Sequence, residues 1–262
     1  KSLKLDPFMI GRTDATLFVA HDKEDEDVLL IEIYGKTLDV GGLRGGKDAD
    51  HTPPRPKEFR IKVDKLFTSP TGVIANAQGF AIRNEAGWNA IELHGLADGD
   101  QKFDIAQKPL NGGRQLSLNC DNFGKALKGL GLSDSVTGGK LYINGRSTAG
   151  TPNAIEGTVK ISNFEVHDLP VLVQLLNATS PFGFINILKN STAFDRLRGG
   201  FRWEGDALEL KDIQASGSAV GMNVDGKVDI NTGVTKLNGT VVPFSAVNNI
   251  LGSIPLIGDM LT

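Results

Sequence analysis

The chain is poor in cysteine and contains no cluster of basic residues. Cys120 is the only cysteine among 262 residues, so no internal disulfide can form and no metal site can be built from several thiolates. The 28 basic and 31 acidic residues give a net charge of −3. Nucleic-acid binding needs clustered Lys and Arg with aromatic stacking partners, so we expect no nucleic-acid partner.

Motifs of catalysis are also missing. The four histidines, His21, His51, His94 and His167, lie far apart, and none belongs to an H-x-x-x-H or H-E-x-x-H pattern. No G-x-S-x-G turn is present for a serine nucleophile. Cys120 follows an expected strand and precedes an apolar segment, which favours a buried small residue over a reactive thiol. We therefore expect a protein that is not an enzyme and that uses neither metal nor cofactor.

Phenylalanine dominates the aromatic residues, with 13 Phe against 2 Trp and 2 Tyr. Phe carries no polar group, so this composition suits apolar surfaces better than recognition by hydrogen bonds. A Phe-rich core and an apolar ligand lining explain it equally well. The position of these residues in the fold has to decide between the two.

Short runs that alternate apolar and polar residues predict half-buried β-strands. The alternating apolar pairs include Phe59 and Ile61, Ile91 and Leu93, Phe103 and Ile105, Leu116 and Leu118, Leu141 and Ile143, Val159 and Ile161, Leu208 and Leu210, Met222 and Val224, and Val228 and Ile230. The strands recur about every 8–12 residues, as in a meander, sandwich or barrel. The sequence therefore predicts a mainly β protein.

Asx-Gly pairs punctuate the alternating runs and predict antiparallel hairpins, because both residue types reach the positive φ that tight turns need. These pairs are Asp98-Gly99, Asn111-Gly112, Asn144-Gly145, Asp225-Gly226 and Asn238-Gly239. Two longer polar stretches predict loops. Gly41–Lys57 is rich in Gly and Pro, and the acidic His21–Asp27 lacks the ligand spacing of a calcium loop, which favours a solvated connection over a cation site.

Helices are expected to be few and short. Asp121–Leu130 predicts one, with Asp121 or Asn122 as its N-cap. Asp168–Thr179 predicts a second, capped by Asp168 and ended by a following Ser-Pro pair. Short helices are also expected at Phe182–Leu188 and Ser245–Leu251.

Two long stretches carry no charge, Leu169–Leu188 and Leu237–Gly258. Both are long enough for a membrane-spanning helix. Their prolines and asparagines argue against spanning, because a broken helix leaves backbone polar groups unpaired in hydrocarbon. Short apolar helices on a β framework remain, and such helices are either buried or in contact with lipid. They can plug the open end of a β core or line an apolar groove for acyl chains.

Four segments resemble the AsmA-like envelope proteins of Gram-negative bacteria, and specifically their YhdP-like branch. They are Asp121–Arg146, Gly157–Ser180, Phe194–Gly233 and Leu237–Thr262. The last is the most specific, with its G-T-V-V-P opening, its N-N-I-L segment and its I-P-L-I-G-D-M-L-T close. The resemblance covers about residues 110–262 well and residues 1–109 more loosely.

The resemblance implies a long periplasmic β-groove that carries phospholipid from the inner membrane toward the outer membrane. It implies an N-terminal inner-membrane anchor that this chain lacks, and it supplies no catalytic residues. We expect the chain to be a fragment of a longer protein. Residues 1–109 would form an N-terminal strand segment of the groove, and residues 110–262 would form the AsmA-like C-terminal region with its apolar helices.

These observations predict a long antiparallel, strongly curved β-sheet that forms a groove or an open sandwich, with a few short apolar helices. The predicted function is non-catalytic binding of phospholipid acyl chains during transport across the envelope. The alternative is a structural or assembly scaffold, whose apolar helices dock an envelope protein partner. Candidate groove residues are Leu172, Leu175, Leu176, Phe182, Phe184, Ile187, Phe201, Trp203, Val242, Phe244, Val247, Ile250, Leu251 and Ile254.

Overall fold

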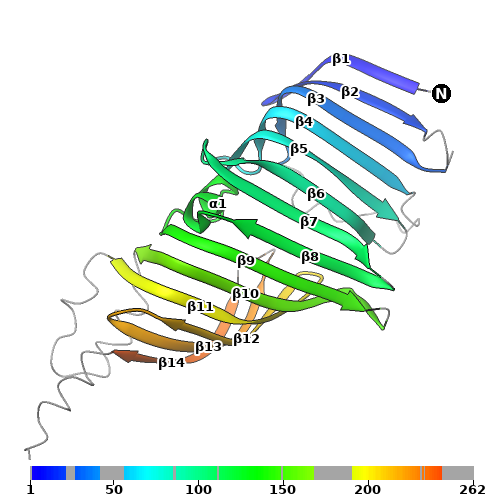
Figure 1. Ribbon diagram of the computed structural model, residues 1–262. Helices are drawn as coiled ribbons and strands as arrows, with labels where there is room; N and C mark the ends of the chain where they lie inside the picture. The colour runs from blue at the N-terminus through cyan, green and yellow to red at the C-terminus, as the bar shows by residue number, and fades with distance from the viewer. Residues whose placement is uncertain are drawn as a thin grey trace, which may run out of the picture.

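One open, strongly curved β-sheet makes up almost all of the described protein (Figure 1). The computed structural model describes residues 2–21, 27–41, 56–84, 87–110, 112–148, 150–167, 191–230, 232 and 234–243. The strands are β1 (Ser2–Ile10), β2 (Thr13–His21), β3 (Leu29–Asp39), β4 (Lys57–Phe67), β5 (Val73–Asn84), β6 (Gly87–Ala97), β7 (Gln101–Leu110), β8 (Gly113–Cys120), β9 (Val136–Thr148), β10 (Thr151–His167), β11 (Ser191–Glu204), β12 (Ala207–Ser216), β13 (Val220–Asp229) and β14 (Thr235–Pro243). The expected curved, mainly β fold is confirmed.

The strands follow one another in the sheet in chain order, so each pairs with its neighbour in sequence. The same sheet runs without a break across residues 109 and 110, because β7 pairs with β8 there. Every neighbouring pair is antiparallel except β3 and β4, which are parallel. The expected antiparallel pairing therefore holds at every neighbouring pair except this one.

The length of the connection explains the parallel pair. Leu29 pairs with Lys57 and Asp39 pairs with Phe67, so the chain returns along the full length of β3 before β4 begins. A hairpin needs only a few residues, whereas a parallel crossover needs a dozen or more. The Gly/Pro-rich stretch Gly41–Lys57 has enough residues for this return. Its composition predicts a loop, but it does not predict whether the next strand pairs in parallel or antiparallel.

Three of the five Asx-Gly pairs lie inside strands and form no turn. Asp98-Gly99 forms the turn between β6 and β7, with both residues at positive φ, and Gly112 lies between β7 and β8. Asn144-Gly145, Asp225-Gly226 and Asn238-Gly239 lie within β9, β13 and β14, so the turns predicted there are wrong.

Close packing is the reason for glycine at position 145. Gly145 on β9 pairs with Gly157 on β10. A Cβ atom on Gly145 would lie 2.7 Å from Ile155 Cγ2 and 3.1 Å from Cζ of Phe201 on β11. Side chains from β10 and β11 therefore meet over Gly145 on this face.

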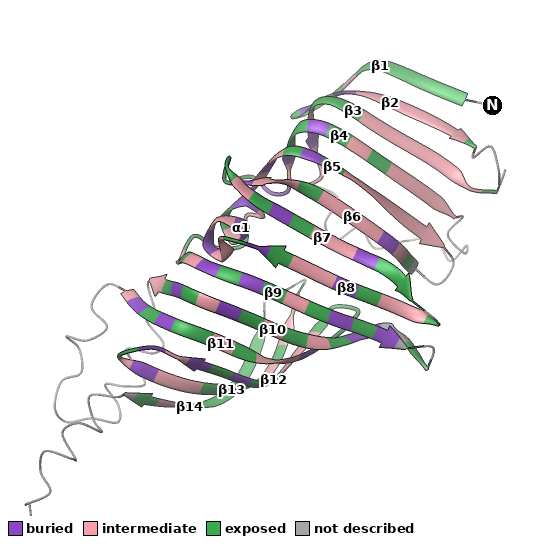
Figure 2. Ribbon diagram, in the orientation of Figure 1, coloured by how far each residue is buried: buried purple, intermediate pink, exposed green. Residues whose placement is uncertain are grey.

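The two faces of the sheet differ in polarity, as period-two alternation requires. Figure 2 shows buried and exposed residues alternating along β9 and β10. The buried residues of one face, called the inner face below, form one connected apolar cluster from β3 to β13. Residues that pair directly across neighbouring strands share a face, so the register assigns each side chain to the inner or the outer face.

A single helix, α1 (Phe123–Gly129), is present among the described residues, and it packs mainly on β9. It confirms the helix expected at Asp121–Leu130. Asn122 is the N-cap, and its Oδ1 accepts a hydrogen bond from the backbone N–H of Lys125 at 3.0 Å. Ala126 of α1 is buried in the inner cluster, so the helix covers one end of the inner face.

The other three expected helices, at Asp168–Thr179, Phe182–Leu188 and Ser245–Leu251, lie outside the described residues. In the part of the chain that the structure describes, no helix is long and apolar enough to cross a membrane.

Cys120 is buried as expected, and its Sγ lies 3.1 Å from the carbonyl oxygen of Asn122. Burial raises the pKa of the thiol, which disfavours the reactive thiolate.

Candidate functional site

A continuous row of apolar residues crosses the inner face of the sheet from β2 to β10. Leu17 pairs with Ile33, Ile33 pairs with Ile61, and the pairing continues from strand to strand as far as Val159. The members of this central row are Leu17, Ile33, Ile61, Gly79, Leu93, Ile105, Leu118, Ile143 and Val159. Each is partly buried, so each leaves part of its surface open. The sheet therefore presents an uninterrupted apolar strip.

The central row is long compared with a lipid acyl chain. Neighbouring strands lie about 4.8 Å apart, so the row extends about 40 Å across the sheet. The hydrocarbon of one membrane leaflet is about 15 Å thick. The strip is therefore long enough for more than one extended acyl chain placed end to end.

A buried row borders the central row on the side of α1. Phe103, Cys120, Leu141 and Ile161 pair in sequence from β7 to β10, and all four are buried. Farther along the same side, the rings of Phe164 and Phe194 stack with centroids 5.2 Å apart. This side of the inner face is closed by packing and by α1.

The border on the other side is more open. Phe59, Ala81 and Ile91 pair across β4, β5 and β6 and are only partly buried. Beyond them, at the ends of the strands, lie the two tryptophans of the chain, Trp88 and Trp203, each 40% exposed. The inner face is thus closed toward α1, and it is more open toward the opposite strand ends only from β4 to β6, because Gln107, Leu116 and Phe201 continue the same border as buried residues.

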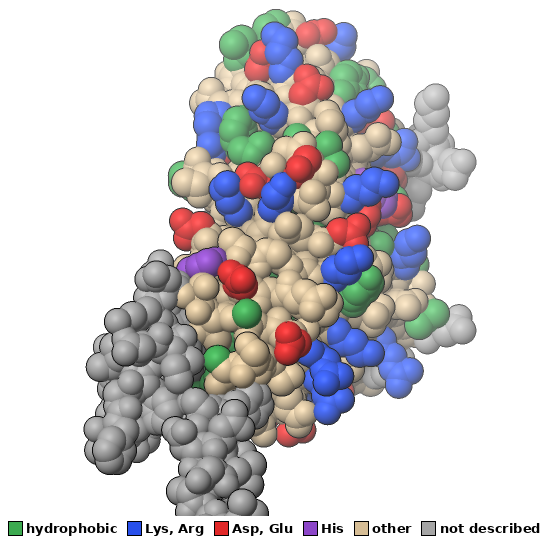
Figure 3. All heavy atoms as spheres, turned by 60° about the vertical axis from the view of Figure 1, so that its left-hand side comes forward, with side chains coloured by type: hydrophobic (Ala, Val, Ile, Leu, Met, Phe, Trp, Pro, Cys, Tyr) green, Lys and Arg blue, Asp and Glu red, His purple; other side chains and the backbone are tan. Residues whose placement is uncertain are grey.

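The outer face is polar over the same strands. One residue along from the central row, an outer row pairs from β2 to β11. It consists of Thr16, Tyr34, Lys62, Gln78, His94, Asp104, Asn119, Tyr142, Lys160 and Arg198. All of these except the partly buried Thr16 are exposed. Figure 3 shows a face of the molecule on which basic and acidic side chains are interspersed.

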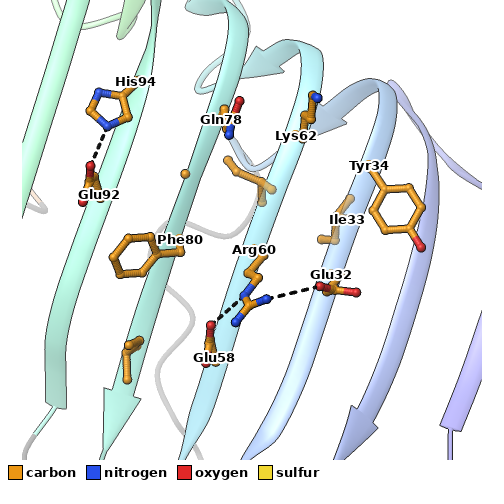
Figure 4. Close-up of a pocket in the computed structure, with 13 residues that line it drawn as sticks. Glu32, Ile33, Tyr34, Glu58, Arg60, Lys62, Gln78, Phe80, Glu92 and His94 are labelled. Atoms are coloured by element: carbon orange, nitrogen blue, oxygen red, sulfur yellow. Dashed lines mark hydrogen bonds and ion pairs between the residues drawn. The ribbon is translucent and has the colours of Figure 1, made fainter. Parts of the chain in front are cut away.

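A shallow hollow of about 550 Å³ lies on the outer face over β3, β4, β5 and β6 (Figure 4). Several of its charged residues pair with one another or with a neighbouring carboxylate. Arg60 Nε donates to Glu58 Oε1 at 2.7 Å, and Arg60 Nη1 lies 3.8 Å from Glu32 Oε1. His94 lies between two carboxylates, 2.5 Å from Asp104 Oδ1 and 2.8 Å from Glu92 Oε1.

The hydrogen bonds around His94 favour its protonated form, but they do not form a catalytic arrangement. Asp104, and then Glu92, raise the pKa of His94 above its usual value, and His94 lowers the pKa of Glu92. The described residues that line the hollow include no Ser, Thr or Cys to act as a nucleophile. Across the described ranges, no group of three or more His, Cys, Asp or Glu residues could hold a metal ion. The hollow therefore combines paired charges with apolar lining residues such as Phe80 and Ile82, and it offers no catalytic group.

Three of the candidate groove residues fall within the described chain. Phe201 is buried on the inner face, where it packs with Leu116 and Ile155. Trp203 pairs with Leu208 on the same face and is half-exposed. Val242 lies on the outer face, because its neighbour Val241 pairs with Met222 of the inner cluster.

The remaining candidates lie outside the described residues. They are Leu172, Leu175, Leu176, Phe182, Phe184, Ile187, Phe244, Val247, Ile250, Leu251 and Ile254. The residues of the central row were not among the candidates, although Ile61, Leu93 and Ile105 belong to the alternating runs that predicted strands. Their alternation was visible in the sequence, but their alignment into one row depends on pairing across strands.

The chain was also compared with known proteins by family, by sequence and by structure. It matches no protein-family model, no curated protein and no solved structure.

Proposed function

We propose that the inner face of the sheet is a groove that binds phospholipid acyl chains without catalysis. The observation that carries this proposal is the central row, an apolar strip that stays partly open from β2 to β10. A folded protein gains stability by covering such surface, at roughly 25 cal/mol per Å². A strip left open over this length is a surface for an apolar ligand.

The shape and chemistry of the strip suit acyl chains in particular. Its side chains are aliphatic, and Gly79 at the middle of the row keeps the surface low there. Each methylene of a bound chain that leaves water contributes about 0.8 kcal/mol. The row offers no side-chain hydrogen bond, so we expect it to accept acyl chains of different lengths with little discrimination.

The cellular setting of the proposal comes from the resemblance to AsmA-like, YhdP-like proteins. On that basis the groove lies in the periplasm of a Gram-negative envelope and takes part in moving phospholipid between the inner and outer membranes. We also propose that the protein is held at the inner membrane. The strands follow one another in chain order, so the inner face is one continuous surface along the sheet. Such a surface suits movement of lipid along it.

Photo-crosslinking tests the proposal residue by residue. A benzophenone amino acid is placed at Ile105, Leu118 or Ile143 in the central row, and at the next residues, Ala106 and Asn119, as matched outer-face controls. We expect phospholipid adducts at the three inner positions and none at the controls, measured by mass spectrometry after irradiation in cells.

Two outcomes would overturn the lipid proposal. Equal lipid labelling on both faces would indicate non-specific contact with membranes. Protein adducts in place of lipid adducts at the inner positions would support the scaffold, in which this face docks a partner.

A further inference from the structure

Apolar side chains interrupt the polar outer face at the hollow over β3, β4, β5 and β6. Phe80 pairs with Arg60 on one side and with Glu92 on the other, so a phenyl ring lies in a row of charged residues. Ile82 lies two residues farther along β5 and also lines the hollow. Tyr34 lines it from β3 and is 42% exposed. The hollow therefore offers apolar surface and polar groups side by side.

The two aromatic residues flank the centre of the hollow. Figure 4 shows the rings of Phe80 and Tyr34 on opposite sides of Arg60. Tyr34 pairs with Lys62, and Lys62 pairs with Gln78, which lies two residues along β5 from Phe80. This register places the Cα atoms of Tyr34 and Phe80 about 12 Å apart, given strands about 4.8 Å apart and a rise of about 3.4 Å per residue. A ligand that contacts both rings is therefore longer than a single six-membered ring.

The charges in the hollow balance one another. The charged residues that line it are Glu32, Glu58, Arg60, Lys62, Glu92 and His94. Arg60 Nε lies 2.7 Å from Glu58 Oε1, and Arg60 Nη1 lies 3.8 Å from Glu32 Oε1. His94 Nε2 lies 2.8 Å from Glu92 Oε1. Three carboxylates therefore face three groups that can carry positive charge, so a charged ligand gains little net attraction here.

Three classes of ligand do not suit this combination. A purely apolar ligand would remove water from the carboxylates without replacing its hydrogen bonds, which is costly. A small ion would leave the apolar side chains without a contact. An extended peptide binds a sheet through the backbone groups of an edge strand, whereas β3, β4, β5 and β6 each pair with a strand on both sides.

A chain of sugar rings suits the hollow better. Its hydroxyl groups both donate and accept hydrogen bonds, so they can donate to the carboxylate of Glu58 and bond to the side-chain amide of Gln78 in either direction. The C–H faces of its rings are apolar and can pack against the aromatic rings of Tyr34 and Phe80. One ligand then satisfies the polar and the apolar parts of the lining together.

We propose that the outer hollow binds a neutral oligosaccharide, with its sugar rings packed against Tyr34 and Phe80 and its hydroxyl groups bonded to Glu58 and Gln78. The hollow lies on the opposite face from the central row. The proposal therefore goes beyond the lipid-binding function and does not depend on it. Such a protein contacts lipid with one face and a glycan with the other.

Binding is first tested on the unmodified protein by nuclear magnetic resonance titration. The probes are the neutral tetrasaccharides maltotetraose, cellotetraose and N-acetylchitotetraose, together with an uncharged tetrapeptide. We expect saturable binding of at least one tetrasaccharide with a dissociation constant of about 1 mM or lower. The shifted resonances should map to β3, β4, β5 and β6. No saturable binding of the three sugars at millimolar concentration, or binding of the tetrapeptide alone, would overturn the proposal.

Substitution then tests the position of the site. Tyr34→Ala should weaken binding of the tetrasaccharide about tenfold, because it removes one of the two aromatic surfaces. Tyr34→Phe keeps the ring and should bind nearly as the unmodified protein does. Tyr142→Ala is the matched control, because Tyr142 is the other tyrosine of the chain, is 45% exposed, and lies in the same outer row on β9. Unchanged affinity in Tyr34→Ala, or an equal loss in Tyr142→Ala, would overturn the assignment to this hollow.

Discussion

Replacing Gly157 with alanine should destabilise the sheet by about 2–3 kcal/mol, because overpacking a close contact forces the backbone to move. A Cβ atom there would lie 2.6 Å from Gly145 Cα and would also collide with the carbonyl oxygen of Asn144. Both contacts are with the backbone of β9, so no rotation of a side chain can relieve them. The midpoint of thermal unfolding should fall by about 5–10 °C for a chain of this size.

Gly150 provides the matched control for this prediction. It lies between β9 and β10, and a Cβ atom there would have no neighbour within 4 Å. Gly150→Ala should therefore leave the unfolding midpoint almost unchanged. Circular dichroism on heating measures both variants. Equal midpoints for Gly157→Ala and Gly150→Ala would show that the glycine pair does not set the close approach of β9 and β10.

Replacing Leu118 with aspartate should remove most of the lipid that the protein retains on purification. Leu118 lies in the central row between Ile105 and Ile143, so a carboxylate there would face bound acyl chains. Leaving an unpaired charge against hydrocarbon costs several kcal/mol, and each 1.4 kcal/mol reduces affinity tenfold. We expect at least a tenfold loss of retained phospholipid, measured by native mass spectrometry.

The neighbouring residue gives a matched control, because the side chain of Asn119 points to the outer face. Asn119→Asp introduces the same charge one residue away and should retain lipid as the unmodified protein does. A second inner variant, Ile143→Thr, makes the central row more polar but keeps a β-branched side chain. Loss of lipid in this variant would therefore reflect the polarity of the row and not misfolding. Equal lipid retention by Leu118→Asp and Asn119→Asp would contradict the assignment of the inner face.

The strands and the first helix could be predicted because their signals are local. Alternation of apolar residues such as Phe103 and Ile105 reports a half-buried strand, and Asn122 marks the start of α1 through a hydrogen bond within one turn. Glycine was harder to interpret. Gly99 permits a turn and Gly145 permits close packing between strands, and a single sequence does not distinguish these two uses.

The site could be predicted less well than the fold, because it depends on register. Ile61 and Leu118 are far apart in the chain, and only pairing through the intervening strands places them in one row. Alternation also does not tell which face lies inside the curve, so Val242 was included although it lies on the outer face. The parallel pairing of β3 with β4 is likewise set by the path of a long connection.

An experimental structure of the protein purified with its lipids in mild detergent tests the central claim most directly. The account predicts elongated density along the central row, in contact with Ile61, Ile105 and Leu118. Density for another part of the chain or for a protein partner over this row, with no lipid, would contradict it.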